Sequence, residues 1–437
     1  MIEIYYIFSE IFFISIFFSL PILLINKNYY RKLEKINFID KISITLIVLV
    51  NILFLFSIFN INIEYFFYLY ILVLFFLVIS NYKKINLKNI NFDYFFIVLI
   101  LFTFFLSVDL ADQIYFSWDA KSNWFFKTLN FYQNQNIENL KNFNNFDYPH
   151  LGPLIWSFFW KFPHGQFEYL GRIFYIFIYL LSILSISNCL KLETFEKLIF
   201  AILLISLTYN YELFSGLQDV LIFSLVLLFV RFSYLIYEKK NKSNNFLFIL
   251  ILLAIFNILS WTKNEGIFYG LFLFFSLIFT YNFSKFDKKF IILGTIVVLL
   301  IRILLFKYYD NQLNPEYFQM KDTFSFDMLL LFNKLKTITF YSLIYFSQNP
   351  IYLITIPLLL YILYKYPRKD IVNFIFYFLI LNFIFIYLTY MFKMDEVELL
   401  IRASMKRVIF QTSGFYFLII IIYVNNYVKL LKNNKKS

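Results

Sequence analysis

The sequence predicts an all-α polytopic membrane protein, and three observations support this fold class. Of the 437 residues, 61% are hydrophobic and only 15% are charged, whereas about a quarter of the residues of a soluble domain are charged. The mean hydropathy is +0.71. The apolar residues form long runs such as 42–61 and 290–306, which is about the length a helix needs to cross the hydrocarbon of a bilayer. These runs do not alternate with polar residues as the strands of a membrane β-barrel would.

About thirteen spanning helices are predicted from these runs. Because backbone groups in lipid must be bonded within the chain, each run is expected to be helical. A long polar segment, 109–166, separates the fourth and fifth runs, and we expect it to carry short interfacial helices, one of them at 154–160 with Trp156 and Trp160 at headgroup level. The predicted spans are 4–25, 43–61, 64–81, 94–108, 167–190, 196–210, 217–237, 246–262, 266–281, 289–306, 350–366, 370–392 and 407–425.

The net charge of +12 is distributed in short basic clusters between the spans. A nucleic-acid partner would want these charges on one folded face, so we interpret them as topology signals, which mark the cytoplasmic side. With thirteen spans every cluster is cytoplasmic, and the loops 109–166, 211–216, 263–265, 307–349 and 393–406 lie outside. The basic clusters are at 27–41, 83–88, 239–242, 285–289, 365–369 and 429–436.

The long outer loop contains the first group of candidate site residues. If the segment 118–127 is helical, Asp119, Asn123 and Lys127 share one face. Trp118 and its aromatic neighbours would partly desolvate the carboxylate of Asp119, which would suit it to act as a general base on a hydroxyl. The structural alternative is an ordinary exposed acid that pairs with Lys127 or Lys121 by helix spacing.

Two further candidate groups lie where spans begin or turn. Asp219 begins a span and is either a second site carboxylate or simply an acid at the positive end of the helix dipole. Lys263 and Glu265 interrupt a long apolar stretch. They either form a phosphate contact, with Glu265 orienting Lys263, or are charges that reach the interface from a tight turn.

Basic residues on the predicted outer side form the last candidate group. Arg402 and Arg407 contradict the positive-inside trend, and binding of an anionic group would explain them. Gln411 follows Arg407 by four residues and shares its helix face. The alternative is a helix end at a loosely defined boundary. The two histidines are too few for a His-based metal site.

Five segments together carry a resemblance to a known family: WDA…W…K (118–127), DYPHLGPL (147–154), QD (218–219), TKNEG (262–266) and SMKRVIFQ (404–411). They resemble the bacterial GT-C superfamily of membrane glycosyltransferases, and are most similar to the branch of protein O-mannosyltransferases and aminoarabinose transferases. The resemblance covers about 94–427, so that 1–93 looks like an extra or divergent N-terminal portion and 428–437 like a basic cytoplasmic tail.

The resemblance implies transfer of a sugar from a polyprenyl-phosphate donor to a hydroxyl of an envelope glycan, lipid or protein. Asp119 would be the base, Asp219 a second acid, and Lys263, Arg402 and Arg407 candidates for the donor phosphate. Tyr148 and His150 of the DYPHLGPL motif join the substrate-binding candidates. Many relatives carry two adjacent acids where this chain has Asp119-Ala120, so the need for a divalent metal stays open.

We therefore expect an enzyme of a bacterial inner membrane, in contact with membrane lipids, with its active site facing the periplasm or the exterior. One alternative is an O-antigen polymerase or ligase, which also combines many helices with large outer loops. Another is a transporter or flippase of lipid-linked glycans. Transporters typically use broken helices and internal repeats, and the sequence shows no duplication and few glycines or prolines in its spans.

Overall fold

The computed structural model is a helical bundle, and no strand occurs among the residues that it describes. These residues are 2–24, 36–81, 93–143, 146, 148–238, 245–308, 328–365, 370–391 and 397–434. Most of the basic clusters used to predict the topology, and Asp147 of the DYPHLGPL motif, lie outside them. In the first half of the chain the helices are α1 (Ile2–Leu24), α3 (Phe38–Ile58), α4 (Ile63–Asn81), α5 (Tyr94–Asp112), η4 (Ala120–Trp124), α6 (Phe125–Tyr132), η5 (Ile137–Asn142), α7 (Leu151–Lys161), α8 (Glu168–Ser187), α9 (Thr194–Thr208) and η6 (Tyr211–Leu213).

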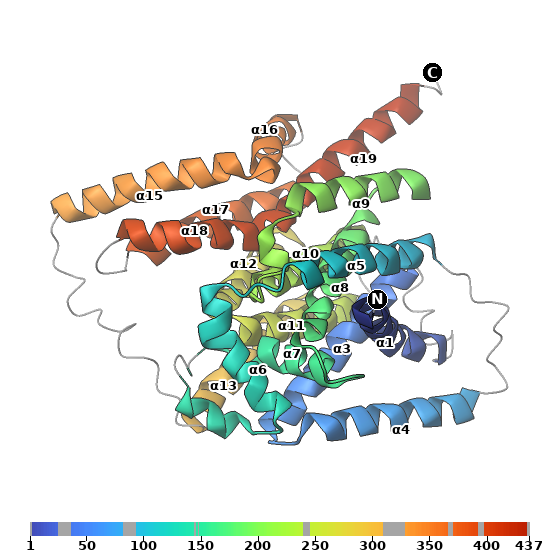
Figure 1. Ribbon diagram of the computed structural model, residues 1–437. Coiled ribbons are helices and arrows are strands. Elements are labelled where there is room, and N and C mark those ends of the chain that lie inside the picture. The colour runs from blue at the N-terminus through green and yellow to red at the C-terminus, as the bar shows by residue number, and fades with distance from the viewer. Residues whose placement is uncertain are drawn as a thin grey trace.

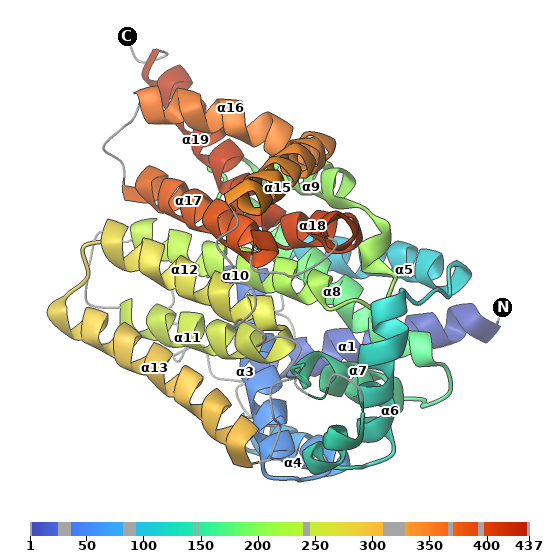
Figure 2. The same cartoon turned by 90° about the vertical axis from the view of Figure 1, so that its left-hand side faces the viewer.

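The second half of the chain continues the bundle (Figure 1). Its helices are α10 (Asp219–Glu238), α11 (Asn245–Thr262), α12 (Asn264–Thr280), α13 (Lys285–Tyr308), α15 (Met328–Gln348), α16 (Pro350–Lys365), α17 (Asp370–Met391), α18 (Val397–Ser413), η9 (Gly414–Tyr416) and α19 (Phe417–Asn434). In Figure 2, α12 lies between α11 and α17. The two views place α4 and α15 on opposite sides of the bundle.

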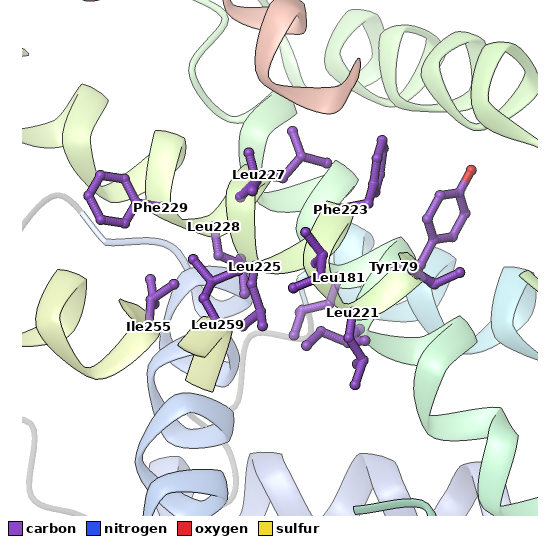
Figure 3. Close-up of a cluster of buried hydrophobic side chains, with 14 of the residues drawn as sticks. Tyr179, Leu181, Leu221, Phe223, Leu225, Leu227, Leu228, Phe229, Ile255 and Leu259 are labelled. Atoms are coloured by element: carbon purple, nitrogen blue, oxygen red, sulfur yellow. The ribbon is translucent and has the colours of Figure 1, made fainter. Parts of the chain in front are cut away.

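Helix α10 is the centre of the core. Its residues from Asp219 to Ile236 are all buried and mostly apolar, as expected of a helix that is surrounded by protein on all sides. It packs against α8, α11 and α18, and Figure 3 shows Leu181 of α8 and Leu259 of α11 beside the leucines of α10. Its 20 residues span about 30 Å at 1.5 Å per residue. The two ends of α10 therefore define the two ends of the bundle.

Apolar side chains also cover the outside of the bundle. Helices α4 and α13 expose rows of large aliphatic and aromatic residues, among them Phe75, Phe76 and Leu293. A soluble protein rarely exposes apolar patches of this extent, whereas lipid chains solvate them. The arrangement fits an integral membrane protein with α4 and α13 facing lipid.

The predicted fold class is confirmed, but the predicted number of thirteen spans is not. Among the described residues, ten helices are long and apolar enough to cross a membrane, or eleven if the bent pair of α15 and α16 is one span. Helices α9 and α12 have 15 and 17 residues and are too short to be counted. The axes of α15 and α16 differ by 96° at the break between them, and α15 lies within the predicted outer loop 307–349.

The interfacial position predicted for the helix near 154–160 is wrong. The corresponding helix α7 is enclosed by protein, with Trp156 fully buried and Trp160 8% exposed. It packs against α6 and α8, and Trp160 stacks on Tyr132 with ring centroids 4.1 Å apart. Aromatic residues at this density suit a protein core as well as a headgroup layer, which is why the sequence pattern alone misplaced them.

Candidate active site

The N-terminal end of α10 gathers charged side chains from segments that are far apart in the sequence. Asp219 begins α10, and its Oδ1 lies 3.0 Å from the Nζ of Lys263, which alone separates α11 from α12. The side-chain amide of Gln411 on α18 donates to the same oxygen. Arg407, one turn earlier on α18, donates from Nη1 to Oδ2 of Asp119 at the start of η4. These five side chains are called the α10 charge cluster.

The two acids of the α10 charge cluster differ in their access to solvent. The side chain of Asp219 is fully buried and that of Lys263 is 10% exposed. The side chain of Asp119 is 30% exposed and that of Arg407 is 16% exposed. A buried charge is tolerated only with good partners, and Lys263 and Gln411 supply them for Asp219. Asp119 is therefore the acid that an incoming molecule can reach, whereas Asp219 fixes the cations around it.

Local sequence explains how these groups reach one another. Arg407 and Gln411 are four residues apart, so both point from one face of α18. The tight turn from α11 to α12 needs Gly266, because a Cβ at this position would lie 2.1 Å from the carbonyl oxygen of Leu259. The turn places Lys263 beside Asp219 and leaves Glu265 3.4 Å from the Lys263 ammonium. The TKNEG motif therefore both forms the tight turn and supplies charged side chains to the cluster.

Arg172 of α8 fixes the two segments that lead into the cluster. Its guanidinium donates to the carbonyl oxygen of Phe214 at 2.6 Å and to that of Tyr115 at 3.1 Å. The backbone N–H of Ser117 donates to the carbonyl oxygen of Ser215 at 3.1 Å, so the same two segments also bind each other directly. The chain before η4 and the chain before α10 are held together at fixed separation.

Several buried acceptor atoms around the cluster have no hydrogen-bond partner among the described residues. They are Oδ2 of Asp219, Oε2 of Glu265, Oε1 of Gln411 and both carboxylate oxygens of Glu212. Native proteins leave few buried polar atoms unpaired, and such atoms gather where water, an ion or a ligand binds. Such atoms also occur elsewhere among the described residues, but several of them lie together at this end of α10, which makes it the candidate site.

Glu212 was not among the site residues predicted from the sequence. It lies in η6, is 2% exposed, and lines a cavity of about 280 Å³. Burial, followed by the negative charge of Asp219, raises the pKa of the Glu212 carboxyl from 4.5 to about 7. The signal that could have found it is an acid placed in a short turn, YELFSGLQD, directly before the acid that begins a buried helix.

The raised pKa of Glu212 predicts how pH affects stability. Between pH 4.5 and 7 the carboxyl ionises in the unfolded chain but not in the folded one, so the folded state loses stability as the pH rises, and the loss is complete above pH 7. Glu212→Gln should therefore stabilise the protein at pH 8 by roughly 3 kcal/mol, and at pH 5 by only about a quarter of that amount. Thermal unfolding in detergent at both pH values measures this, and equal effects at the two values would contradict it.

Three predicted binding residues form a second group around α6 and α7. The Lys127 ammonium donates to the carbonyl oxygen of Tyr148 at 2.6 Å, and the His150 ring lies 3.2 Å from the Ser57 hydroxyl. Burial, and then the positive charges of Lys127 and Arg302, lower the pKa of His150 to about 3, so the ring is neutral. This group packs the first loop against α3.

The helix face predicted for Asp119, Asn123 and Lys127 is not preserved. Residues 120–124 form a π-helix, whose wider turn changes the angular spacing of side chains. Asp119 consequently meets Arg407, and the expected alternative, a pair with Lys121 or Lys127, is not what the structure shows. Asn123 is buried, and Trp118 is 77% exposed.

Arg402 lies apart from the α10 charge cluster. Its guanidinium binds Glu398 on the same helix and donates to the Tyr341 hydroxyl at 2.9 Å, and its side chain is 62% exposed. Of the predicted phosphate contacts, Lys263 and Arg407 are thus brought together and Arg402 is not. Among the described residues, no three His, Cys, Asp or Glu side chains are arranged to hold a metal ion.

No family model, curated protein or solved structure matches this chain.

Proposed function

We propose that the protein is an integral-membrane glycosyltransferase that uses a polyprenyl-phosphate-linked sugar as donor and a hydroxyl of an envelope glycan, lipid or protein as acceptor. The observation that carries this proposal is the α10 charge cluster. It combines one accessible carboxylate, Asp119, with two cations, Arg407 and Lys263, at the end of an apolar helical bundle. A base for a hydroxyl and cations for a departing phosphate are the groups that this reaction requires.

In this reaction the acid Asp119 and the two cations of the cluster have separate roles. The acceptor oxygen attacks the anomeric carbon of the donor sugar while its proton passes to the carboxylate of Asp119. The bond between the anomeric carbon and the phosphate oxygen breaks, and the electron pair leaves with polyprenyl phosphate. Arg407 and Lys263 stabilise the negative charge that develops on this phosphate. No other reactant is needed for the balance of atoms and charge.

The ion pair between Asp119 and Arg407 links donor binding to the availability of the Asp119 carboxylate. In the structure the guanidinium of Arg407 binds Asp119 and also interacts electrostatically with Asp219. A donor phosphate that binds Arg407 competes with Asp119 for the same guanidinium. Its arrival would weaken the ion pair and release the carboxylate of Asp119 for contact with the acceptor hydroxyl. Asp219 acts in this scheme as a positioning residue for Lys263 and Arg407.

The basic clusters support an extracytoplasmic position for this end of α10, and we propose that the membrane is a bacterial inner membrane. By the positive-inside rule, the connection after α10 at 239–242 is cytoplasmic, and Asp219 at the other end of that helix is then outside. A lipid-linked donor would reach the cluster from the bilayer, since its prenyl chain needs an apolar path and its phosphate needs a cation at the membrane boundary.

Binding of polyprenyl phosphate, the expected product, tests the phosphate site separately from turnover. Arg407→Gln is expected to weaken binding by about tenfold or more, because a charge-assisted hydrogen bond is lost. Native mass spectrometry of the full chain with added polyprenyl phosphate measures the bound fraction. Arg402→Gln is the matched control on the same helix and should bind as the wild type does. Equal binding by the wild type and Arg407→Gln would refute the assigned phosphate contact.

A further inference from the structure

A cavity of about 280 Å³ adjoins the α10 charge cluster on a neighbouring face of α18. It is formed by the C-terminal end of α9, the break between α15 and α16, and the α18 residues Lys406 and Ser413, and is called the α9–α18 cavity. Glu212 connects the two sites, because it lines the cavity and interacts electrostatically with Asp219 and Arg407. The cavity is not used by the reaction scheme described above.

The polar groups that line the α9–α18 cavity are suited to hydrogen bonding with a hydroxyl-rich ligand. The Glu212 carboxylate is buried, and neither of its oxygens accepts a hydrogen bond of normal geometry from the described residues. The Tyr211 hydroxyl nevertheless lies close enough to lower the pKa of the Glu212 carboxyl. Asn210 and Asn349 use their side-chain oxygens to accept from the backbone N–H groups of Glu212 and Ile351, at 2.9 Å and 3.1 Å. The amide N–H groups of both asparagines then provide donors.

Aromatic side chains and the size of the cavity further restrict the class of ligand that it can bind. Tyr209, Tyr211 and Tyr345 line the cavity together with the polar groups, and tyrosine offers both an apolar ring face and a hydroxyl. Sites for drug-sized molecules hold about 300–1,000 Å³, so a cavity of about 280 Å³ suits a single small ring. An acceptor carboxylate, amide donors and aromatic faces around such a volume match the alternating hydroxyl and C–H surfaces of a monosaccharide.

We infer that the α9–α18 cavity binds one neutral monosaccharide ring, with Glu212 accepting hydrogen bonds from ring hydroxyls. The role of that ring as part of a transferase substrate rests on the proposed function, whereas its binding does not. Glu212 is thereby a specificity-determining residue, and it places the sugar next to the face of α18 that carries Arg407.

Binding of free monosaccharides to the full chain in nanodiscs tests this inference. Saturation-transfer difference NMR would be recorded with glucose, galactose, mannose and N-acetylglucosamine. At least one of these sugars should bind the wild type saturably. At pH 8, where the Glu212 carboxyl is ionised, Glu212→Gln should weaken its binding by about fivefold to tenfold, since a charge-assisted hydrogen bond is replaced by a neutral one. Ser206→Phe, which places a ring in the cavity from α9, should abolish binding.

The controls separate this inference from the proposed function. Ser347→Phe is a matched substitution on the exposed surface of α15 outside the cavity, and it should bind sugar as the wild type does. Asp119→Asn should bind sugar normally even though transfer is lost, so sugar binding without any transfer activity would overturn only the proposed function. The inference is overturned if none of the four sugars binds, if Ser206→Phe binds like the wild type, or if inorganic phosphate displaces the sugar competitively.

Discussion

Replacing Asp119 with asparagine is expected to slow sugar transfer by about 10³-fold, since a positioned general base typically contributes 10²–10⁴-fold. Asparagine keeps the size of the side chain and can still accept a hydrogen bond from Arg407, but it cannot take the proton of the acceptor hydroxyl. The variant should therefore fold and should bind polyprenyl phosphate. Transfer would be followed by mass spectrometry of the lipid-linked donor.

Asp109→Asn is the matched control for this variant. Asp109 is another half-buried acid at the same end of the bundle, and its carboxylate accepts a hydrogen bond from the Tyr209 hydroxyl at 2.8 Å. We expect Asp109→Asn to retain nearly full activity. Transfer by Asp119→Asn within a few-fold of the wild-type rate would remove Asp119 as the base.

The second large effect is expected at the opposite end of α10. Arg231 and Asp40 form a buried ion pair there, with Nη2 2.7 Å from Oδ2 and Nε 3.1 Å from Oδ1, and the Ser185 hydroxyl also donates to the carboxylate at 2.7 Å. Arg231→Met would leave Asp40 buried with an uncompensated charge. Loss of one partner of a buried pair typically costs about 3–5 kcal/mol of stability. Reversible unfolding in mixed detergent micelles would measure this loss.

The double variant Asp40→Leu/Arg231→Met separates the pair from its buried charge. Because apolar residues of similar volume replace buried ion pairs at little cost, the double variant should recover most of the stability that Arg231→Met loses. Arg402→Met, which breaks an exposed pair with Glu398, should leave the unfolding midpoint nearly unchanged. A double variant as unstable as Arg231→Met would show that the pair does more than neutralise Asp40.

The elements of the fold could be predicted from the sequence because hydrophobic runs report directly on burial or lipid contact. Twelve of the thirteen predicted spans each correspond to one helix, whereas the last, 407–425, begins within α18 and ends within α19. Run length alone does not distinguish a helix that crosses the bilayer from one of 15 residues such as α9. Helix α15 was missed because polar residues such as Asn333, Lys334 and Lys336 interrupt its apolar pattern. Its packing against α17 and α18 is tertiary information.

The candidate site could be predicted as a set of residue types but not as a set of pairs. Charged residues are rare in the apolar sequence, so the sequence indicated both acids of the α10 charge cluster and its two residues on α18. The partner of Asp119 could not be predicted, because 288 positions separate it from Arg407 and a π-helix changed the local helix face. Glu212 was missed because a single acid in a short turn resembles an ordinary surface residue until its burial is known.

Consumption of a lipid-linked donor tests the proposed transferase activity most directly. The wild-type protein in nanodiscs would be mixed with a panel of polyprenyl-phosphate sugars and a membrane extract that contains acceptors, and donor and product would be followed by mass spectrometry. We expect that one donor is consumed, that polyprenyl phosphate appears in equal amount, and that both changes require Asp119. Folded protein that consumes no donor across the panel, or that consumes one equally well as Asp119→Asn, would contradict the proposed activity.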